Sequence, residues 1–336
     1  PNTKPAVDSP EMVSYVFERA AQGCGVHVLP IAAVSMGERG EQLTDAKVLK
    51  QAGAVALSDD GMPVQNANLM RDALICAHRQ GLVVLSHCED ADMVKNYAVN
   101  EGRISRQLGI PGRPAIAEEI MVMRDAMLAE ETQTAVHICH ISTGRAVDIV
   151  RKYKKKGVKI TCETCPQYFT LNQSEILKQG AMARVNPPLR TTRDVAAVLA
   201  GLKDGTIDCI VTDHAPRSEE EKARGREQAP SGMVGLETSL AVSLTQLYHT
   251  GEMTLPEIVA KMTIQPARLL GLEKGRLSVG RAADLTLFDP DEEWVVDASQ
   301  FASKGRNTPF DGWKLKGKVK YTIVDGKMIY QDGGQG

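Results

Sequence analysis

The sequence lacks a long apolar run, an excess of charge of either sign and a paired set of cysteines, and each absence excludes a class of protein. No stretch reaches the roughly 18 apolar residues that cross a bilayer, and the amino end shows no leader-like pattern. Acidic and basic residues nearly balance, 42 against 40, which gives no support to nucleic acid or a membrane surface as a partner. We therefore expect a cytoplasmic protein that binds neither.

The cysteines also argue against a secreted, disulfide-bonded scaffold. There are seven, an odd number, and most fall inside apolar strand or helix patterns, so we expect buried, reduced thiols. Cys162 and Cys165 have the spacing of half a zinc finger or of a redox pair, but no second pair or nearby histidine completes the site. We expect a structural role for both.

What the sequence does contain is a regular alternation of apolar segments of strand length with amphipathic segments of helix length. The expected strands are 26–34, 54–58, 83–86, 135–141, 159–164 and 208–212. The expected helices include 66–79, 118–129, 145–156 and 192–202, and two more, 236–248 and 255–270, follow the last strand. Continuous apolar strands alternating with helices predict an α/β fold with a parallel sheet covered on both faces.

Four acidic or imidazole side chains stand just past four of these strands: Asp60, His87, His140 and Asp213. In a (β/α)8 TIM-type barrel the loops that follow the strands share one face, so residues far apart in sequence converge there. Aspartate and neutral histidine are natural ligands of zinc. We predict a barrel with a metal site, and the alternative is an open doubly wound sheet, where four such ligands would converge less readily.

Each of these residues also has a simpler interpretation. The Asp59-Asp60-Gly61 segment alone would be a turn, and either histidine alone could be a hydrogen-bonded core residue. Strand alternation places Asp59 opposite to Asp60, and His137 opposite to His140, so we expect structural roles for Asp59 and His137. The position of all four candidates at strand ends favours the metal site.

Six strands are fewer than the eight of a closed barrel, and the chain opens on a turn-like Pro-Asn-Thr-Lys-Pro segment. We expect the first two barrel strands to lie upstream of this chain. After residue 275 short strands are expected at 283–288, 293–296 and 318–330, the last interrupted by a hairpin signal at Asp325-Gly326. We therefore predict a barrel over 1–275 and, over 276–336, the carboxyl-terminal part of a small β-sandwich, because three or four strands are too few to be stable alone.

Several short motifs together carry a family resemblance. Ser58-Asp-Asp-Gly61, Ser86-His-Cys-Glu89, His140-Ile-Ser-Thr143, Asn186-Pro-Pro-Leu-Arg190, Thr212-Asp-His-Ala-Pro216 and Gly235-Leu-Glu-Thr238 resemble, in order, the signatures of dihydroorotases of the bacterial two-zinc type in the amidohydrolase superfamily. The segment Gly280-Arg-Ala-Ala-Asp-Leu285 resembles the carboxyl-terminal β-segment of that superfamily. The resemblance runs from residue 1 to about 330.

The resemblance implies an activity and a set of roles. The reaction is the reversible cyclisation of N-carbamoyl-L-aspartate to L-dihydroorotate and water, in pyrimidine biosynthesis. Two zinc ions (Zn2+) would share Asp60; His87 and His140 would hold one of them, and Asp213 would touch the other and transfer the proton. Substrate contacts would come from Asn2, Asn186, Ser231 and Gly232. A homodimer, with possible association with aspartate carbamoyltransferase, is also implied.

Two departures from the family pattern bear on activity. No His-x-His occurs in these 336 residues. The arginine that follows this motif in the family and clamps the substrate carboxylate has no counterpart either. We therefore expect this chain as given to be inactive. The position four residues after Asp213 is commonly a substrate-binding histidine and here is Arg217, which would either pair with the substrate carboxylate or lie in a solvated loop beside Glu219, Glu220 or Glu221.

Two other functions remain open at this point. A hydantoinase or allantoinase is suggested by the segment from Glu163 to Tyr168, although those relatives bridge their metals with a carbamylated lysine where this chain has Asp60. A non-catalytic, dihydroorotase-like scaffold of aspartate carbamoyltransferase is the third possibility, and the presence of all four ligand candidates disfavours it.

Overall fold

The computed structural model describes residues 1–95 and 97–333, and its centre is a sheet of six short parallel strands. The strands are β1 Ile31–Ala33, β2 Ala56–Ser58, β3 Val84–Ser86, β4 Val136–Ile138, β5 Ile160–Thr164 and β6 Cys209–Ile210. Each lies inside a predicted segment, so the six predicted strands are confirmed. They neighbour one another in strict chain order. A doubly wound sheet would reverse its order at a switch point, so this order is that of a barrel wall.

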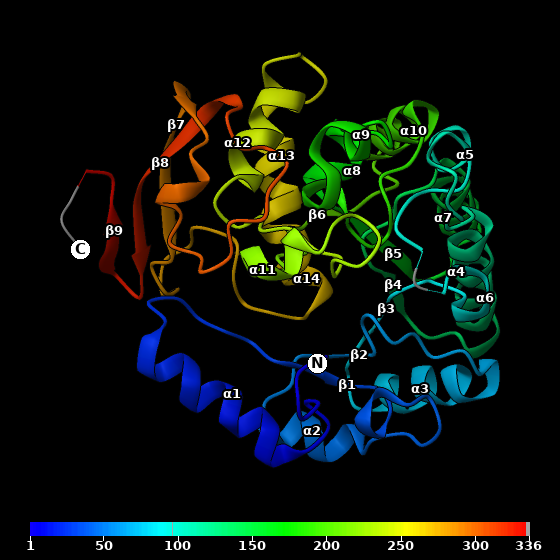
Figure 1. Ribbon diagram of the computed structural model, residues 1–336. Coiled ribbons are helices and arrows are strands. Elements are labelled where there is room, and N and C mark those ends of the chain that lie inside the picture. The colour runs from blue at the N-terminus through cyan, green and yellow to red at the C-terminus, as the bar shows by residue number, and fades with distance from the viewer. Residues whose placement is uncertain (96, 334–336) are drawn as a thin grey trace.

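Helices cover the outside of this wall (Figure 1). Four lie at predicted positions: α3 Ala67–Arg79, α6 Ile116–Thr132, α7 Gly144–Lys155 and α10 Thr192–Lys203. Shorter helices fill the connections: α2 Ala46–Ala52, α4 Ala91–Val94, α5 Arg103–Leu108, α8 Pro166–Thr170, α9 Glu175–Gln179 and α11 Glu219–Ala223, with 3-10 turns η1 Met36–Glu38 and η2 Gly180–Ala183. Among the described residues no helix combines the length and apolarity that a membrane span requires.

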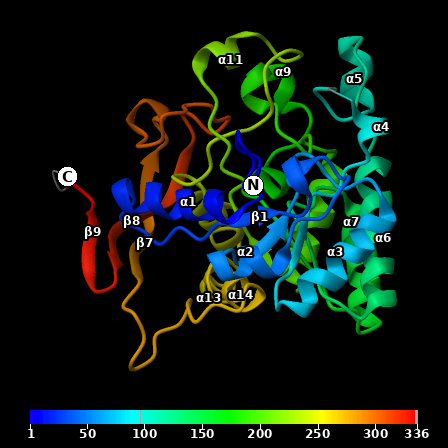
Figure 2. The ribbon, with the colours of Figure 1, turned by 90° about the horizontal axis from the view of Figure 1, so that it is seen from below.

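The first helix, α1 Pro10–Gly23, was not expected from the sequence. Its start carries a clear signal: the Ser9 side chain accepts a hydrogen bond from Met12 N, and Pro10 occupies the first helical position, where its missing N–H costs nothing. Figure 2 shows α1 running across the side of the molecule from the barrel towards the small sheet. Val13 of this helix is buried, and Met12, Val16 and Phe17 pack against the main core while partly exposed.

Both faces of the parallel sheet are buried. On the helix side, Ala32, Leu57 and Val84 belong to the main core. On the other side, Ala56, Leu85 and Cys139 form a separate small cluster. Adjacent strand residues point to opposite faces, so a strand buried on both sides needs a continuous apolar run, as predicted.

The helical segments after β6 are present but interrupted. The predicted 236–248 consists of α12 Ser239–Ser243 continued by a π-helical turn, η3 Leu244–Tyr248. The predicted 255–270 consists of α13 Leu255–Met262 and α14 Ile264–Leu269. Thr263 lies between α13 and α14 with φ −132° and ψ −84°, and Pro266, which cannot donate a backbone hydrogen bond, follows in the first turn of α14.

A three-stranded antiparallel sheet completes the described chain: β7 Leu285–Val295, β8 Lys314–Val324 and β9 Lys327–Gln331, with the turn η4 Ala298–Gln300 after β7. The prediction of two strands at 283–288 and 293–296 was wrong, because both belong to β7. The pairing with β8 is interrupted between Asp289 and Glu293, where Pro290 has no N–H and the Asp289 side chain accepts from Asp291 N and Glu292 N.

The predicted hairpin between β8 and β9 is confirmed. Asp325 and Gly326 have φ of 49° and 77°, the left-handed pair that a two-residue turn requires. This small sheet packs on the barrel: Thr245 Oγ1 accepts from Lys316 N at 2.9 Å, and Leu315 shares a core with Val242. His27, just before β1, also lies 3.2 Å from Asp325 through its Nε2.

All seven cysteines are free, as expected, and five are buried, including Cys162 and Cys165. Cys24 is exposed and Cys76 is partly exposed, so the expectation of burial was wrong for Cys24.

Candidate metal centre

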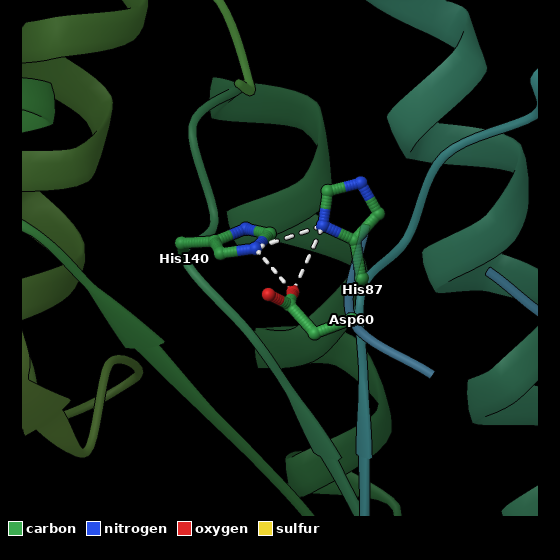
Figure 3. Close-up of side chains that lie close together, drawn as sticks. All are labelled: Asp60, His87 and His140. Atoms are coloured by element: carbon green, nitrogen blue, oxygen red, sulfur yellow. Dashed lines mark hydrogen bonds and ion pairs between the residues drawn. The ribbon is translucent and has the colours of Figure 1, made fainter. Parts of the chain in front are cut away.

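Asp60, His87 and His140 meet at the carboxyl ends of three neighbouring strands, β2, β3 and β4 (Figure 3). The Nδ1 atom of His87 lies 2.9 Å from Nε2 of His140, and each of these nitrogens lies 3.2 Å from Oδ1 of Asp60. Three of the four predicted ligand residues therefore form one compact group. Both histidines are buried.

The spacing of these atoms fits a metal ion. Two ligands bound at about 2.0–2.1 Å to a tetrahedral zinc ion are about 3.3 Å apart, close to the separations found here. Two imidazole nitrogens and one carboxylate oxygen also form a donor set that zinc accepts. The residues present therefore fit a divalent cation at this position.

In the absence of a metal ion, the neighbouring Asp60 carboxylate favours the protonated form of both histidines. Burial lowers the pKa of His87, but hydrogen bonds to Asp60 and Glu89 outweigh that effect and raise it to about 10. For Asp60, burial raises the pKa, while hydrogen bonds from His140 and His87 outweigh it and hold the pKa well below its ordinary value. Metal binding at these nitrogens must therefore displace protons.

Strand alternation explains why the residues next to the ligands do not join them. Asp59 turns to the other side, where its Oδ1 accepts from Val34 N at 2.7 Å and Ser35 N at 3.1 Å. His137 is fully buried in β4, with Nδ1 2.8 Å from Thr161 Oγ1 and Nε2 3.0 Å from Glu163 Oε2. Asp59 and His137 both lie where the sequence placed them, outside the ligand group.

A buried ion pair supports the loop that carries His140. Glu118, on α6, accepts hydrogen bonds from Ser142 N at 2.9 Å and Thr143 N at 3.1 Å, and from the Ser142 hydroxyl. Arg190 donates to the same carboxylate at 3.2 Å and to Ser142 Oγ at 3.0 Å. The loop after β4 is thereby fixed to the loop that contains Asn186.

Asp213 follows β6 and is not one of the three converging residues. Its φ is 47°, so the chain turns sharply there. Burial raises the pKa of Asp213 to about 6, and the negative charge of Asp60 adds to the effect while His140 opposes it. The structure therefore gives Asp213 the protonation properties of an acid–base group near neutral pH.

Two of the predicted substrate residues, Asn2 and Asn186, lie beside the ligand group. Asn186 Nδ2 lies 3.4 Å from Nε2 of His87. The Asn2 side chain lies against Gly61, next to Asp60: a Cβ at Gly61 would be 3.3 Å from Asn2 Nδ2.

Arg217, Ser231 and Gly232 lie together after β6. Arg217 Nε donates to the Ser231 carbonyl at 2.9 Å, and a Cβ added to Gly232 would be 3.4 Å from that nitrogen. In the part of the chain that the structure describes, no ion pair joins Arg217 to any of Glu219, Glu220 and Glu221. Arg217 instead lines a surface pocket of about 390 Å³ with Lys222 and Arg306.

Sequence comparison bears on the family. The profile of the family described as Dihydro-orotase-like matches residues 1–146, and that of the Amidohydrolase family matches residues 133–330. A dihydroorotase of Acetivibrio thermocellus is 48% identical over 99% of this chain and 78% of its own length. A dihydroorotase of Pelotomaculum thermopropionicum is 50% identical over the same shares. This chain belongs to the dihydroorotase family.

Structural comparison agrees with the barrel assignment. An L-hydantoinase (dihydropyrimidinase) from Arthrobacter aurescens superposes with a TM-score of 0.88 at 26% identity, over 99% of this chain and 76% of the other. A D-hydantoinase, at 22% identity, superposes with a TM-score of 0.83 over 97% of this chain and 74% of its own, which shows the shared fold alone. The predicted family and α/β fold class of this dihydroorotase-family chain are confirmed.

Proposed function

We propose that the two-zinc form of this protein has dihydroorotase activity, the reversible cyclisation of N-carbamoyl-L-aspartate to L-dihydroorotate and water. The observation that carries the proposal is the group of Asp60, His87 and His140 at adjacent strand ends, in a chain about half identical to dihydroorotases over nearly its whole length. The substrate is a small molecule.

In this proposal Asp60, His87 and His140 hold a divalent cation, assigned as zinc. When bound, such an ion lowers the pKa of a water molecule and polarises a carbonyl oxygen. Asp213 accepts a proton during ring opening and returns it to the leaving nitrogen, and the same carboxyl serves in reverse during ring closure. Asn2, Asn186, Arg217, Ser231 and Gly232 orient the substrate.

The number of metal ions follows from the ligands present. One group of three converging ligand atoms supports one tightly held zinc ion, and these 336 residues contain no His-x-His pair to help hold a second. We therefore propose that these 336 residues alone bind about one zinc ion tightly and turn over little or no dihydroorotate.

A hydantoinase-type reaction is the second candidate, and the structural likeness to the L-hydantoinase favours it. Against it stands Asp60, since the hydantoinase relatives bridge their metals with a carbamylated lysine there. The non-catalytic scaffold is disfavoured by the same three ligands, because a scaffold has no physical need of them.

We further propose a barrel over 1–275 and a carboxyl-terminal β-sandwich segment over 276–336. A cytoplasmic location and a homodimer complete the proposal, with possible association with aspartate carbamoyltransferase. Size-exclusion chromatography with light scattering, with and without that carbamoyltransferase, tests the assembly. A monomer that does not associate with it would contradict this part.

Metal analysis combined with an assay on L-dihydroorotate, hydantoin and allantoin tests the activity. Zinc-dependent turnover of dihydroorotate by the enzyme that carries both metals is the expected result. Turnover of hydantoin without dihydroorotate would replace the assignment with the hydantoinase. Two bound metal ions without turnover of any of the three substrates would favour the scaffold.

A further inference from the structure

The His87 ring has a second nitrogen, Nε2, that points away from Asp60 and His140 (Figure 3). Glu89, two residues along the chain, places its Oε2 atom 3.6 Å from this nitrogen. His87 and Glu89 lie on the same segment after β3, so their relation is fixed by local backbone geometry. The side chain of Glu89 is only 13% exposed, which leaves little water to compete with it.

This contact matters because the two ring nitrogens of a neutral imidazole have opposite roles. If Nδ1 gives its lone pair to a metal ion, the proton must sit on Nε2. An acceptor beside Nε2 then favours that tautomer and fixes the plane of the ring. Glu89 is an acceptor in that position.

Asn186 Nδ2 also lies near Nε2 of His87, at 3.4 Å, but the Asn186 amide is oriented by other contacts. Its Oδ1 accepts from Arg113 Nη1, and its Nδ2 donates to Glu89 Oε2 at 3.3 Å. Because the amide presents an N–H to the ring, it cannot accept the Nε2 proton. Glu89 is therefore the acceptor available to that proton.

Arg113 holds this arrangement in place. Its Nη1 donates to Glu89 Oε1 at 2.7 Å and also to the side-chain oxygen Oδ1 of Asn186. Its Nε donates to the backbone carbonyl of Tyr97 at 2.6 Å. The Arg113 side chain is 7% exposed, so the pair with Glu89 is largely removed from water. The guanidinium thus fixes the position of the Glu89 carboxylate through a charge-assisted hydrogen bond.

We propose that Glu89 and Arg113 are positioning residues of the metal centre: Glu89 sets the tautomer and ring plane of His87, and Arg113 fixes Glu89. This rests on the proposed function only in requiring that His87 binds a metal ion. It makes no demand on the identity of the substrate.

Zinc affinity of the purified protein, measured by competition with a chromophoric chelator, tests the proposal. Glu89→Gln should weaken zinc binding about tenfold or more, the usual effect of losing such a partner. Arg113→Lys keeps the charge but loses the fork that spans Glu89 and Tyr97, and should weaken binding less. Glu131→Gln removes a carboxylate from a surface pair with Arg71 and serves as the matched control with unchanged affinity.

Two further readouts separate positioning from a merely structural role. Thermal unfolding of the same metal-free variants reports stability, and the 15N-edited signal of the His87 Nε2 proton in the zinc-loaded protein reports the hydrogen bond. A loss of affinity larger than in the control, with a shifted Nε2 proton signal, supports the proposal. Unchanged affinity in both Glu89→Gln and Arg113→Lys overturns it, even if both variants are less stable. If the unmodified protein binds no zinc, the proposed function itself fails, and this inference fails with it.

Discussion

At the residue scale, the side chains of adjacent positions can have unrelated environments. Asp59 accepts hydrogen bonds from backbone N–H groups, whereas Asp60, one residue later, faces two imidazoles. The alternation of a strand is enough to predict this difference. Arg113 carried no comparable signal, because its role depends on a fold that brings it to Glu89 and Asn186.

The first prediction separates proton transfer from metal holding. In the enzyme that carries both metals, Asp213→Asn should lower turnover about a hundredfold or more, the usual range for loss of a positioned acid–base group, and retain most of the metal. His87→Ala should lose metal first. Steady-state kinetics with parallel metal analysis make the comparison, and near-normal turnover by Asp213→Asn would contradict the role given to it.

The second prediction concerns Arg217. If its guanidinium pairs with the carboxylate of dihydroorotate, Arg217→Ala in the enzyme that carries both metals should raise KM about tenfold or more, as expected for a charge-assisted contact. A ring substrate without the carboxylate, such as dihydrouracil, should be little affected and serves as the control. An unchanged KM for dihydroorotate would contradict a substrate-binding role and leave Arg217 as a lining residue of the surface pocket that it shares with Lys222 and Arg306.

At the scale of elements, α11 shows how buried polar contacts help to fix a loop after β6. Its Lys222 is buried and donates to three carbonyl oxygens, those of Ala181, Arg184 and Pro230. The ammonium group is one of several polar contacts that hold this loop, with the hydrogen bonds from Arg217 to Ser231 and from Arg184 to Arg226. Burial, together with the nearby Arg217 and Arg184, lowers the pKa of Lys222 to about 8.

The third prediction is a pH dependence of stability. Between about pH 8 and 10.5 the unfolded chain binds more protons at Lys222 than the folded chain, so the contribution of this group becomes more favourable as pH rises. The free-energy difference between the unmodified protein and Lys222→Met, from urea unfolding, should shift towards the unmodified protein over that range. The exposed Lys178→Met serves as control, and a flat difference for Lys222→Met would contradict the prediction.

At the scale of the whole molecule, the sequence could predict the strands, the helices between them and three converging ligands, because periodicity and strand-end position are local properties. It could not predict that 283–288 and 293–296 belong to one strand, because the irregular pairing between them forms only against the facing strand β8. Nor could it predict the Glu118–Arg190 pair, whose partners meet only when α6 and the loop after η2 are in place.

The fourth prediction concerns metal removal. A zinc ion at one hundred times its dissociation constant adds about 2.7 kcal/mol to stability, so a chelator should lower the thermal midpoint by about 4 °C. His87→Ala, which lacks a ligand, should show little response to the chelator. Scanning calorimetry with and without the chelator measures the midpoint of both proteins. An equal decrease in both would place the stabilising metal elsewhere.

The three proposed ligands of the metal centre follow consecutive strands, so all of them lie between residues 60 and 140. During translation this part of the chain leaves the ribosome well before β5, β6 and Asp213. The contacts that bring the three residues together span at most 80 residues, and folding begins at the amino end during synthesis. We therefore expect the nascent chain to acquire its zinc once α7 has emerged, and ribosome-bound chains stalled beyond that point should retain zinc unless His87 is replaced. Failure to retain it until Asp213 has emerged would contradict this order. Metallation would then precede catalytic competence in the life of each molecule.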